Sequence, residues 1–122
     1  MTASNQNLIR PGYETKPIPG FPHAPFGWSR EHAKAVAQLE GLTLTQVHWQ
    51  VIHALQEIYS RDEASTLNAR DLHDALDEHF HTVGGINHLY TLFPKGPLAQ
   101  GCLLAGLEPP AGTQDKGFGS AV

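Results

Sequence analysis

Glycine and proline limit the lengths of the elements that this chain can form. The 122 residues include twelve glycines and nine prolines, and five of the prolines lie within residues 1–27. Because proline breaks helices and interior strands, that stretch is expected to form a Pro/Gly-rich N-terminal arm. Residues 108–122 lack apolar periodicity. The sequence therefore predicts an arm over 1–27, one helical domain over 28–107 and a flexible C-terminal tail over 108–122.

Apolar residues at helical spacing fill the first half of the predicted domain. Ser29 as N-cap and Gly41 as C-terminal stop predict a helix over 30–40. Thr45 can cap a second helix over about 46–60, in which apolar residues recur every three or four positions. Trp49 lies beside this stripe. We expect it to be buried.

Two more helices are predicted in the second half. Asn68 can cap a third helix, which should end before Gly84 and Gly85, and a last helix should begin at Pro97 and end at Gly106. The apolar residues 86–93 are expected to form only a short turn.

The expected fold class is mainly α, a small single-domain bundle of four to five helices. The second and third helices could form a helix-turn-helix-like pair, and residues 7–18 at most a short N-terminal β-hairpin.

The charge balance disfavours a nucleic-acid partner. Eight Lys and Arg residues against twelve Asp and Glu give a net charge of −4. Residues 61–81, which hold most of the third helix, contain two bases and six acids, and such a segment repels phosphate. No apolar run approaches the ~20 residues that cross a bilayer. We expect a cytoplasmic protein that uses no membrane.

Histidine is frequent, with eight residues in the chain. Zinc sites on helices use pairs four positions apart, whereas the pairs His48/His53, His73/His79 and His79/His81 have other spacings. Neither a metal site nor a cofactor is predicted.

Cys102 is the single cysteine, so it is the candidate sulfur-binding thiol. Reactive thiols are thiolates near a cation or a helix N-terminus. Cys102 lies about five residues inside its helix, although Lys95 is near in sequence and Gly101 should leave its flank open. Free cysteines are also among the most buried residues. A reactive role and a structural role both stay open on these grounds.

Two long motifs carry a resemblance to a known family. Residues 89–110 (LYTLFPKGPLAQGCLLAGLEPP) are similar to YLYxLFPxGPxxQxxxxAGLPxP, and residues 40–52 (EGLTLTQVHWQVI) to EGIxLTxEHWxVI. The pairs WS at 28–29 and RDL at 70–72 match two shorter anchors. Together these motifs, over about residues 28–110, resemble the DsrC/TusE family of sulfur-relay proteins.

The resemblance implies a mostly helical fold and a role in sulfur metabolism. Family members carry persulfide sulfur on cysteine, in tRNA thiolation, sulfite reduction or sulfur oxidation. The carrier thiol is the next-to-last residue of a C-terminal arm, and many members have a second cysteine in the last helix. Cys102 matches the helix cysteine, whereas Thr113 stands where the arm cysteine is expected. Threonine cannot form a persulfide.

Three functions follow for this chain. The first is a sulfur-relay protein that handles or regulates persulfide transfer, at most a sulfurtransferase-type carrier component rather than a turnover enzyme. The second is a cysteine-independent adaptor, and the third a DNA-binding regulator, which the acidic third helix disfavours. The expected partners are other sulfur-relay proteins or a sulfite-reductase-type complex. They would dock on a surface formed by Lys95, Gly96, Pro97 and Gly101.

Overall fold

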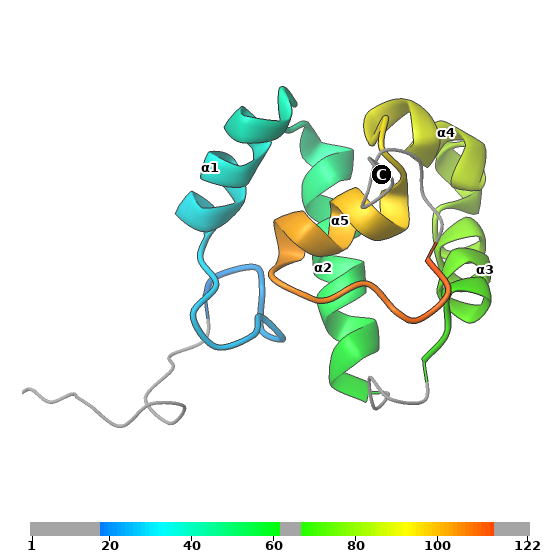
Figure 1. Cartoon of the computed structure of the whole chain (residues 1–122), viewed down its shortest axis with the longest axis horizontal. Helices are drawn as coiled ribbons and strands as arrows, with labels where there is room; N and C mark the ends of the chain where they lie inside the picture. Colours follow the sequence, from blue (N-terminus) through cyan, green and yellow to red (C-terminus); the bar gives the residue numbers. More distant parts are fainter. Residues whose placement is uncertain (1–17, 62–66, 114–122) are drawn as a thin grey trace, which may run out of the picture.

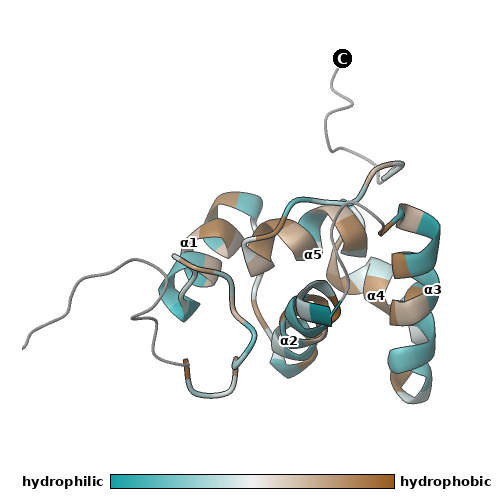
Figure 2. Cartoon of the chain, turned by 90° about the horizontal axis from the view of Figure 1, so that it is seen from below, coloured by the Kyte–Doolittle hydropathy of each residue, from teal (hydrophilic) through white to brown (hydrophobic). Residues whose placement is uncertain are grey.

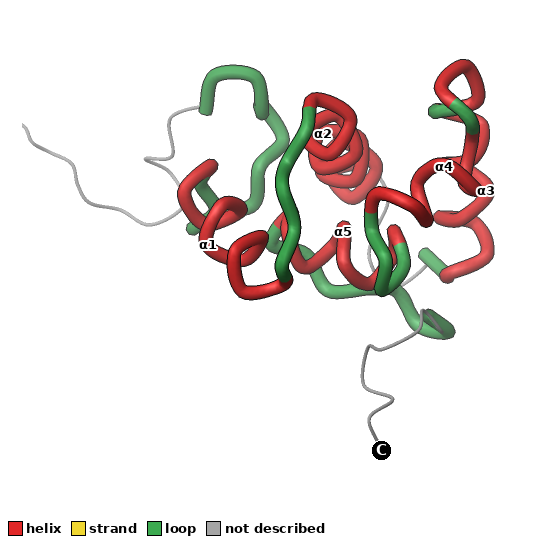
Figure 3. The backbone as a smooth tube through the Cα atoms, turned by 90° about the horizontal axis from the view of Figure 1, so that it is seen from above, coloured by secondary structure: helices red, strands yellow, loops and turns green. Residues whose placement is uncertain are grey.

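The computed structural model describes residues 18–61 and 67–113. Within them lie five α-helices and one short 3₁₀ helix: α1 (Arg30–Glu40), α2 (Gln46–Arg61), α3 (Ala69–His79), η3 (His81–Val83), α4 (Gly85–Leu92) and α5 (Pro97–Ala105). The described residues contain isolated β-bridges but no strand (Figure 3). The predicted mainly α fold is confirmed.

Local capping signals set the helix ends as predicted. Ser29 Oγ accepts a hydrogen bond from the His32 N–H at 3.1 Å, and Gly41, at φ 73°, ends α1 in the left-handed region. Asn68 Oδ1 accepts from the Asp71 N–H at 2.8 Å and so begins α3. These short-range bonds explain why the sequence predicted α1 and the start of α3 closely. The predicted third helix runs up to Gly84, whereas α3 ends at His79 and the separate turn η3 follows it.

The last helix, α5, forms the centre of the molecule. It packs against α1, α2, α3 and α4, and all its residues except Leu103 are buried. Figure 1 shows α5 crossing in front of α2, with α1 on one side and α3 and α4 on the other. Polar residues cover the outer faces of α1, α2 and α3 (Figure 2). The two helices of the predicted helix-turn-helix-like pair each pack chiefly on another helix, α2 on α5 and α3 on α4.

The segment predicted as a short apolar turn forms the helix α4. Its first turn is capped from α3, because Asp77 Oδ1 accepts a hydrogen bond from the Ile86 N–H at 2.8 Å. A Cβ at Gly85 would lie 2.6 Å from the same oxygen. The capping residue Asp77 therefore stands nine residues before Ile86 and on another helix, where a local pattern does not reveal it.

The prediction that Trp49 is buried is wrong in degree. Trp49 is only partly buried, whereas Trp28 is 5% exposed. The Trp28 Nε1–H donates to the Leu104 carbonyl at 2.8 Å, and the Trp28 ring lies 5.0 Å from that of Phe21. Trp49 stands at the edge of the α2 stripe, against the turn that holds Phe21. The residues before α1 thus supply the buried tryptophan.

Both predicted ends of the domain contact it. Phe21, from the predicted arm, belongs to the core, and Pro110, from the predicted tail, is buried. The Ala69 N–H donates to the Ala111 carbonyl at 3.2 Å, which fastens the chain beyond α5 to the start of α3. The predicted hairpin lies outside the described residues except for Ile18. The division into arm, domain and tail stays a prediction. Among the helices described, none is both long and apolar enough to cross a membrane.

Candidate functional site

Cys102 lies on α5 with no exposed surface. Its Sγ is 3.6 Å from the hydroxyl oxygen of Tyr59, on α2. The Tyr59 hydroxyl donates to the carbonyl of Glu108 at 2.6 Å. Because this bond uses the single phenolic hydrogen, the thiol is the donor in the contact between Cys102 and Tyr59.

Tyr59 is a neutral phenol in this environment. Burial raises its pKa well above the ordinary value of 10.0, and the neighbouring Cys102 and Glu108 raise the pKa further. At physiological pH the hydroxyl therefore keeps its proton. It holds the chain after α5 in place and does not act as a base for the thiol.

The chain beyond α5 passes Tyr59 of α2, which bonds to Glu108, and then reaches the start of α3, where Ala111 bonds to Ala69. The orange-to-red segment of Figure 1 follows this path. Gly106 ends α5, and the Leu107 N–H donates back to the Cys102 carbonyl at 2.8 Å. Thr113, at the position of the expected arm cysteine, donates its hydroxyl to the Pro110 carbonyl at 2.6 Å. The side chain at the position where the resemblance places an arm cysteine is thus a hydrogen-bonded hydroxyl.

The four predicted docking residues do not form an open surface around Cys102. Lys95 keeps 50% of its side chain exposed, but Gly96, Pro97 and Gly101 are buried. The expectation that Gly101 leaves the flank of Cys102 open is wrong. A Cβ at Gly101 would lie 2.9 Å from Leu55 Cδ1, so this glycine lets α5 pack closely on α2.

Sequence reasoning missed a polar cluster that joins α1 to α5. Gln100 is almost completely buried, and its Nε2 donates to Glu40 Oε1 at 2.9 Å. The same carboxylate oxygen lies 3.3 Å from Lys95 Nζ, and the Lys95 N–H donates to Gln100 Oε1 at 3.3 Å. Glu40 opens one of the quoted motifs and Gln100 lies in the other, which was the available signal.

A second long-range bond starts from His48, in the same motif as Glu40. His48 Nδ1 accepts from the Thr45 N–H at 3.0 Å, so its Nε2 carries the hydrogen and donates to the Leu92 carbonyl at 2.9 Å. The imidazole thus caps the start of α2 and ties it to the end of α4. Within residues 18–61 and 67–113, no three His, Cys, Asp or Glu side chains come together as a metal site.

Comparisons with known proteins place the chain in a family. The family model described as "DsrC like protein" matches residues 18–113, which covers all of the helices and the segment after α5. No solved structure matches the chain.

Individual proteins are also similar to this chain. The chain is 39% identical over 85 residues to the "Sulfurtransferase TusE homolog" of Haemophilus influenzae, covering 69% of this chain and 77% of the relative. It is 34% identical over 83 residues to "Sulfurtransferase TusE" of Yersinia pseudotuberculosis, covering 68% and 77%. It is 37% identical over 84 residues to "Sulfurtransferase TusE" of Sodalis glossinidius, covering 68% and 77%. The chain therefore belongs to the family of DsrC-like proteins.

Proposed function

We propose that this chain is a sulfur-relay protein that handles or regulates the transfer of persulfide sulfur between partner proteins. The observation that carries the proposal is the family match over residues 18–113, together with relatives that are named sulfurtransferases. Cys102 is the only cysteine in the sequence, so it is the one side chain able to hold sulfane sulfur.

The chemical step is a transfer between two sulfur atoms. The Cys102 thiol loses its proton to water, and its thiolate attacks the outer sulfur of a partner's persulfide. A new S–S bond forms at Cys102, the S–S bond of the partner breaks, and the partner leaves as a thiolate. No external oxidant or reductant is needed, and the reverse reaction passes the sulfur on.

Burial makes this step depend on local movement. Cys102 has no exposed surface, and the Tyr59 hydroxyl lies between its sulfur and the Glu108 carbonyl. An attacking geometry at Sγ requires Tyr59 or the chain around Glu108 to shift. Sulfur loading is therefore expected to be slow in the free protein and faster when a partner opens this contact.

The partners in the proposal are other sulfur-relay proteins, with a sulfite-reductase-type complex as a more specific case. Lys95 is the exposed part of the predicted docking surface and stands at the turn before α5. Gly96, Pro97 and Gly101 contribute by shaping the backbone of that turn and helix, since they are buried.

Intact-mass measurement tests the proposal. Incubation of the folded chain with a small persulfide donor should add ~32 Da per sulfur, and Cys102→Ser should add nothing. The chain in denaturing urea is the matched control, because its thiol is fully accessible and should react quickly. If the unfolded chain reacts while the folded chain, alone and with candidate partners, gains no mass, Cys102 is not a carrier.

A further inference from the structure

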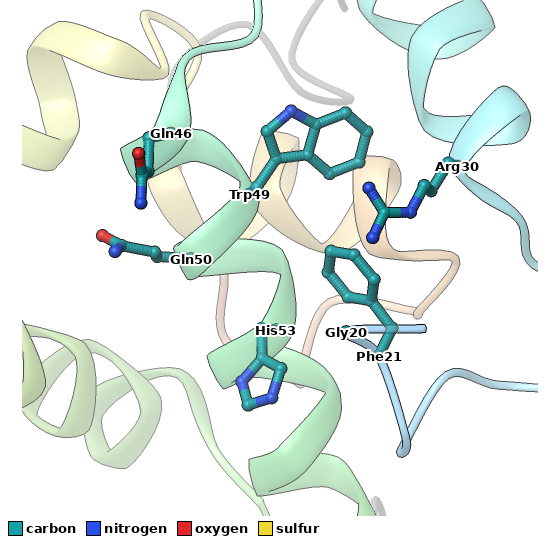
Figure 4. Close-up of a pocket in the computed structure, with 7 residues that line it drawn as sticks. All are labelled: Gly20, Phe21, Arg30, Gln46, Trp49, Gln50 and His53. Atoms are coloured by element: carbon teal, nitrogen blue, oxygen red, sulfur yellow. The ribbon is translucent and has the colours of Figure 1, made fainter. Parts of the chain in front are cut away.

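A pocket of about 380 Å³ lies over the outer face of α2, on the side away from α5. Its walls come from the turn at Gly20 and Phe21, from Arg30 at the start of α1, and from α2 (Figure 4). The α2 side chains include Gln46, Gln50 and His53, which are spaced at i, i+4 and i+7 and so share one helix face. Its volume is within the range of small-ligand and side-chain sites.

Among the described residues that line this pocket, Arg30 alone has a fixed positive charge. Its guanidinium lies 5.0 Å from the ring centroid of Phe21 and 5.8 Å from that of Trp49. Figure 4 shows it pointing towards both rings. Nη2 donates to the Pro19 carbonyl at 2.6 Å. The two rings and this bond hold the guanidinium in one orientation.

The guanidinium is available to an anion. It has five N–H donors, and its one hydrogen bond among the described residues is to Pro19. No carboxylate of the described part of the chain forms an ion pair with Arg30. No Asp or Glu is among the described residues that line the pocket, in a chain of net charge −4. Charge complementarity at this place therefore favours a carboxylate.

A second pocket, of about 350 Å³, continues the first across α2. Gln50 and His53 line both pockets, and the second ends at Phe80 and Val83, beside α3. Val83 is 40% exposed. Figure 2 shows α2 between the segment before α1 on one side and α3 on the other, in agreement with this path. We call the two pockets together the α2 groove. Two adjoining pockets that share Gln50 and His53 suit an extended chain better than one compact small molecule.

We propose that the α2 groove docks an extended segment of a partner protein that carries a carboxylate beside an aromatic or aliphatic side chain. The carboxylate binds Arg30, its apolar neighbour packs on the partly exposed ring of Trp49, and the backbone amides of the segment bond to Gln46 and Gln50. The groove shares no residue with the surroundings of Cys102 that are described above. Docking is therefore independent of whether Cys102 carries sulfur.

A blocked pentapeptide with one glutamate between two phenylalanines is the probe, and the same peptide with glutamine is its control. Binding to the full chain is followed by NMR through the two tryptophan indole N–H signals. The Trp49 signal should shift, and that of Trp28 should not, because its N–H is bonded to Leu104 inside the core. The glutamine peptide should bind about tenfold more weakly, as expected for the loss of a charge-assisted hydrogen bond.

Variants assign the site. Arg30→Gln should weaken binding about tenfold, whereas Arg70→Gln, which removes the same charge from an exposed position on α3, should change it by less than about twofold. Gln50→Ala, at an exposed position shared by both pockets, should weaken binding about threefold and covers the case in which Arg30→Gln does not fold. Cys102→Ser should bind normally.

Three results would overturn the proposal. The first is no shift of the Trp49 signal at any peptide concentration reached. The second is equal binding of the glutamate and glutamine peptides. The third is binding of a single-stranded oligonucleotide that is tighter than that of the peptide and depends on Arg30. Because Cys102→Ser separates peptide binding from persulfide formation, failure here leaves the test of the proposed function intact.

Discussion

Replacing Trp28 with alanine tests how the residues before α1 stabilise the core. The indole is 5% exposed, its Nε1–H donates to the buried Leu104 carbonyl at 2.8 Å, and its ring contacts Phe21. Trp28 is 76 residues from Leu104 along the chain. The substitution therefore removes a link between α5 and the start of the domain.

The structure gives the size of the effect. An aromatic side chain buries about 150–250 Å², which at about 25 cal/mol per Å² corresponds to about 4–6 kcal/mol. Because an unfolded chain already buries part of this area, we expect Trp28→Ala to lower the free energy of unfolding by about 4 kcal/mol, as for other aromatic truncations. Trp28→Phe keeps most of the ring but leaves the Leu104 carbonyl without its donor, which should cost about 1–3 kcal/mol.

Trp49→Ala is the matched control. Trp49 is partly buried and none of the described residues forms a hydrogen bond with its indole nitrogen, so the loss should be about 1–2 kcal/mol. Urea denaturation followed by far-ultraviolet circular dichroism measures all three variants without relying on tryptophan fluorescence. If Trp49→Ala costs as much as Trp28→Ala, the assignment of the buried tryptophan is wrong. If Trp28→Phe costs nothing, the bond to Leu104 does not contribute to stability.

Three other predictions follow from single contacts. In urea denaturation, Gly106→Ala should lower the free energy of unfolding by about 2 kcal/mol more than Gly41→Ala. Both glycines have positive φ, but of the two only Gly106 would bring the added Cβ against another side chain, at 2.9 Å. Equal losses would contradict this. Because the pKa of Tyr59 is raised in the folded state, its contribution to stability is present below pH 10.0 and is lost as the pH rises above that value. Spectrophotometric titration should show a late phenolate component that Tyr59→Phe removes. Glu40→Ala should destabilise the fold by about 1–3 kcal/mol and Lys95→Ala by less than about 1 kcal/mol. The exposed ion pair between Lys95 and Glu40 is weak, whereas the Glu40 carboxylate also accepts a hydrogen bond from the buried amide of Gln100. The reverse order in urea denaturation would refute this.

The sequence predicts those parts of the fold that depend on neighbouring residues. Ser29, Asn68 and Gly106 act within one helical turn of their own positions, and the helices that they begin or end lie where predicted. The start of α4 depends on the bond from Ile86 to Asp77, which lies nine residues before Ile86 and on another helix. Apolar spacing on α2 indicated that Trp49 is near the core, but the depth of burial depends on how Phe21 and its turn pack there.

The candidate site shows the same limit. Counting cysteines identifies Cys102, and its helix was predicted, but its neighbour Tyr59 lies on another helix and bonds to Glu108, 49 residues away. The bond between Gln100 and Glu40 spans 60 residues. Such contacts require the packed arrangement of the helices, and no spacing within one segment predicts them.

The residues that carry the family resemblance mainly hold the backbone together. Trp28 joins the start of the domain to α5, His48 joins α2 to α4, and Gln100 joins α5 to α1. These bonds explain why the motifs indicate the fold reliably. They do not supply a reactive thiol.

The one departure from the family pattern described above changes a residue expected to be reactive, not a residue that holds the fold together. Thr113 occupies the position expected for the arm cysteine, and its hydroxyl is bound to the Pro110 carbonyl. Since a hydroxyl does not take up sulfane sulfur, any sulfur held by this chain must be on Cys102, beneath Tyr59. In the proposed function, the bond from Tyr59 to Glu108 controls access, because the same hydroxyl contacts the thiol and fastens the chain after α5. If Cys102 carries sulfur as proposed, the transfer is coupled to movement of the segment that follows α5.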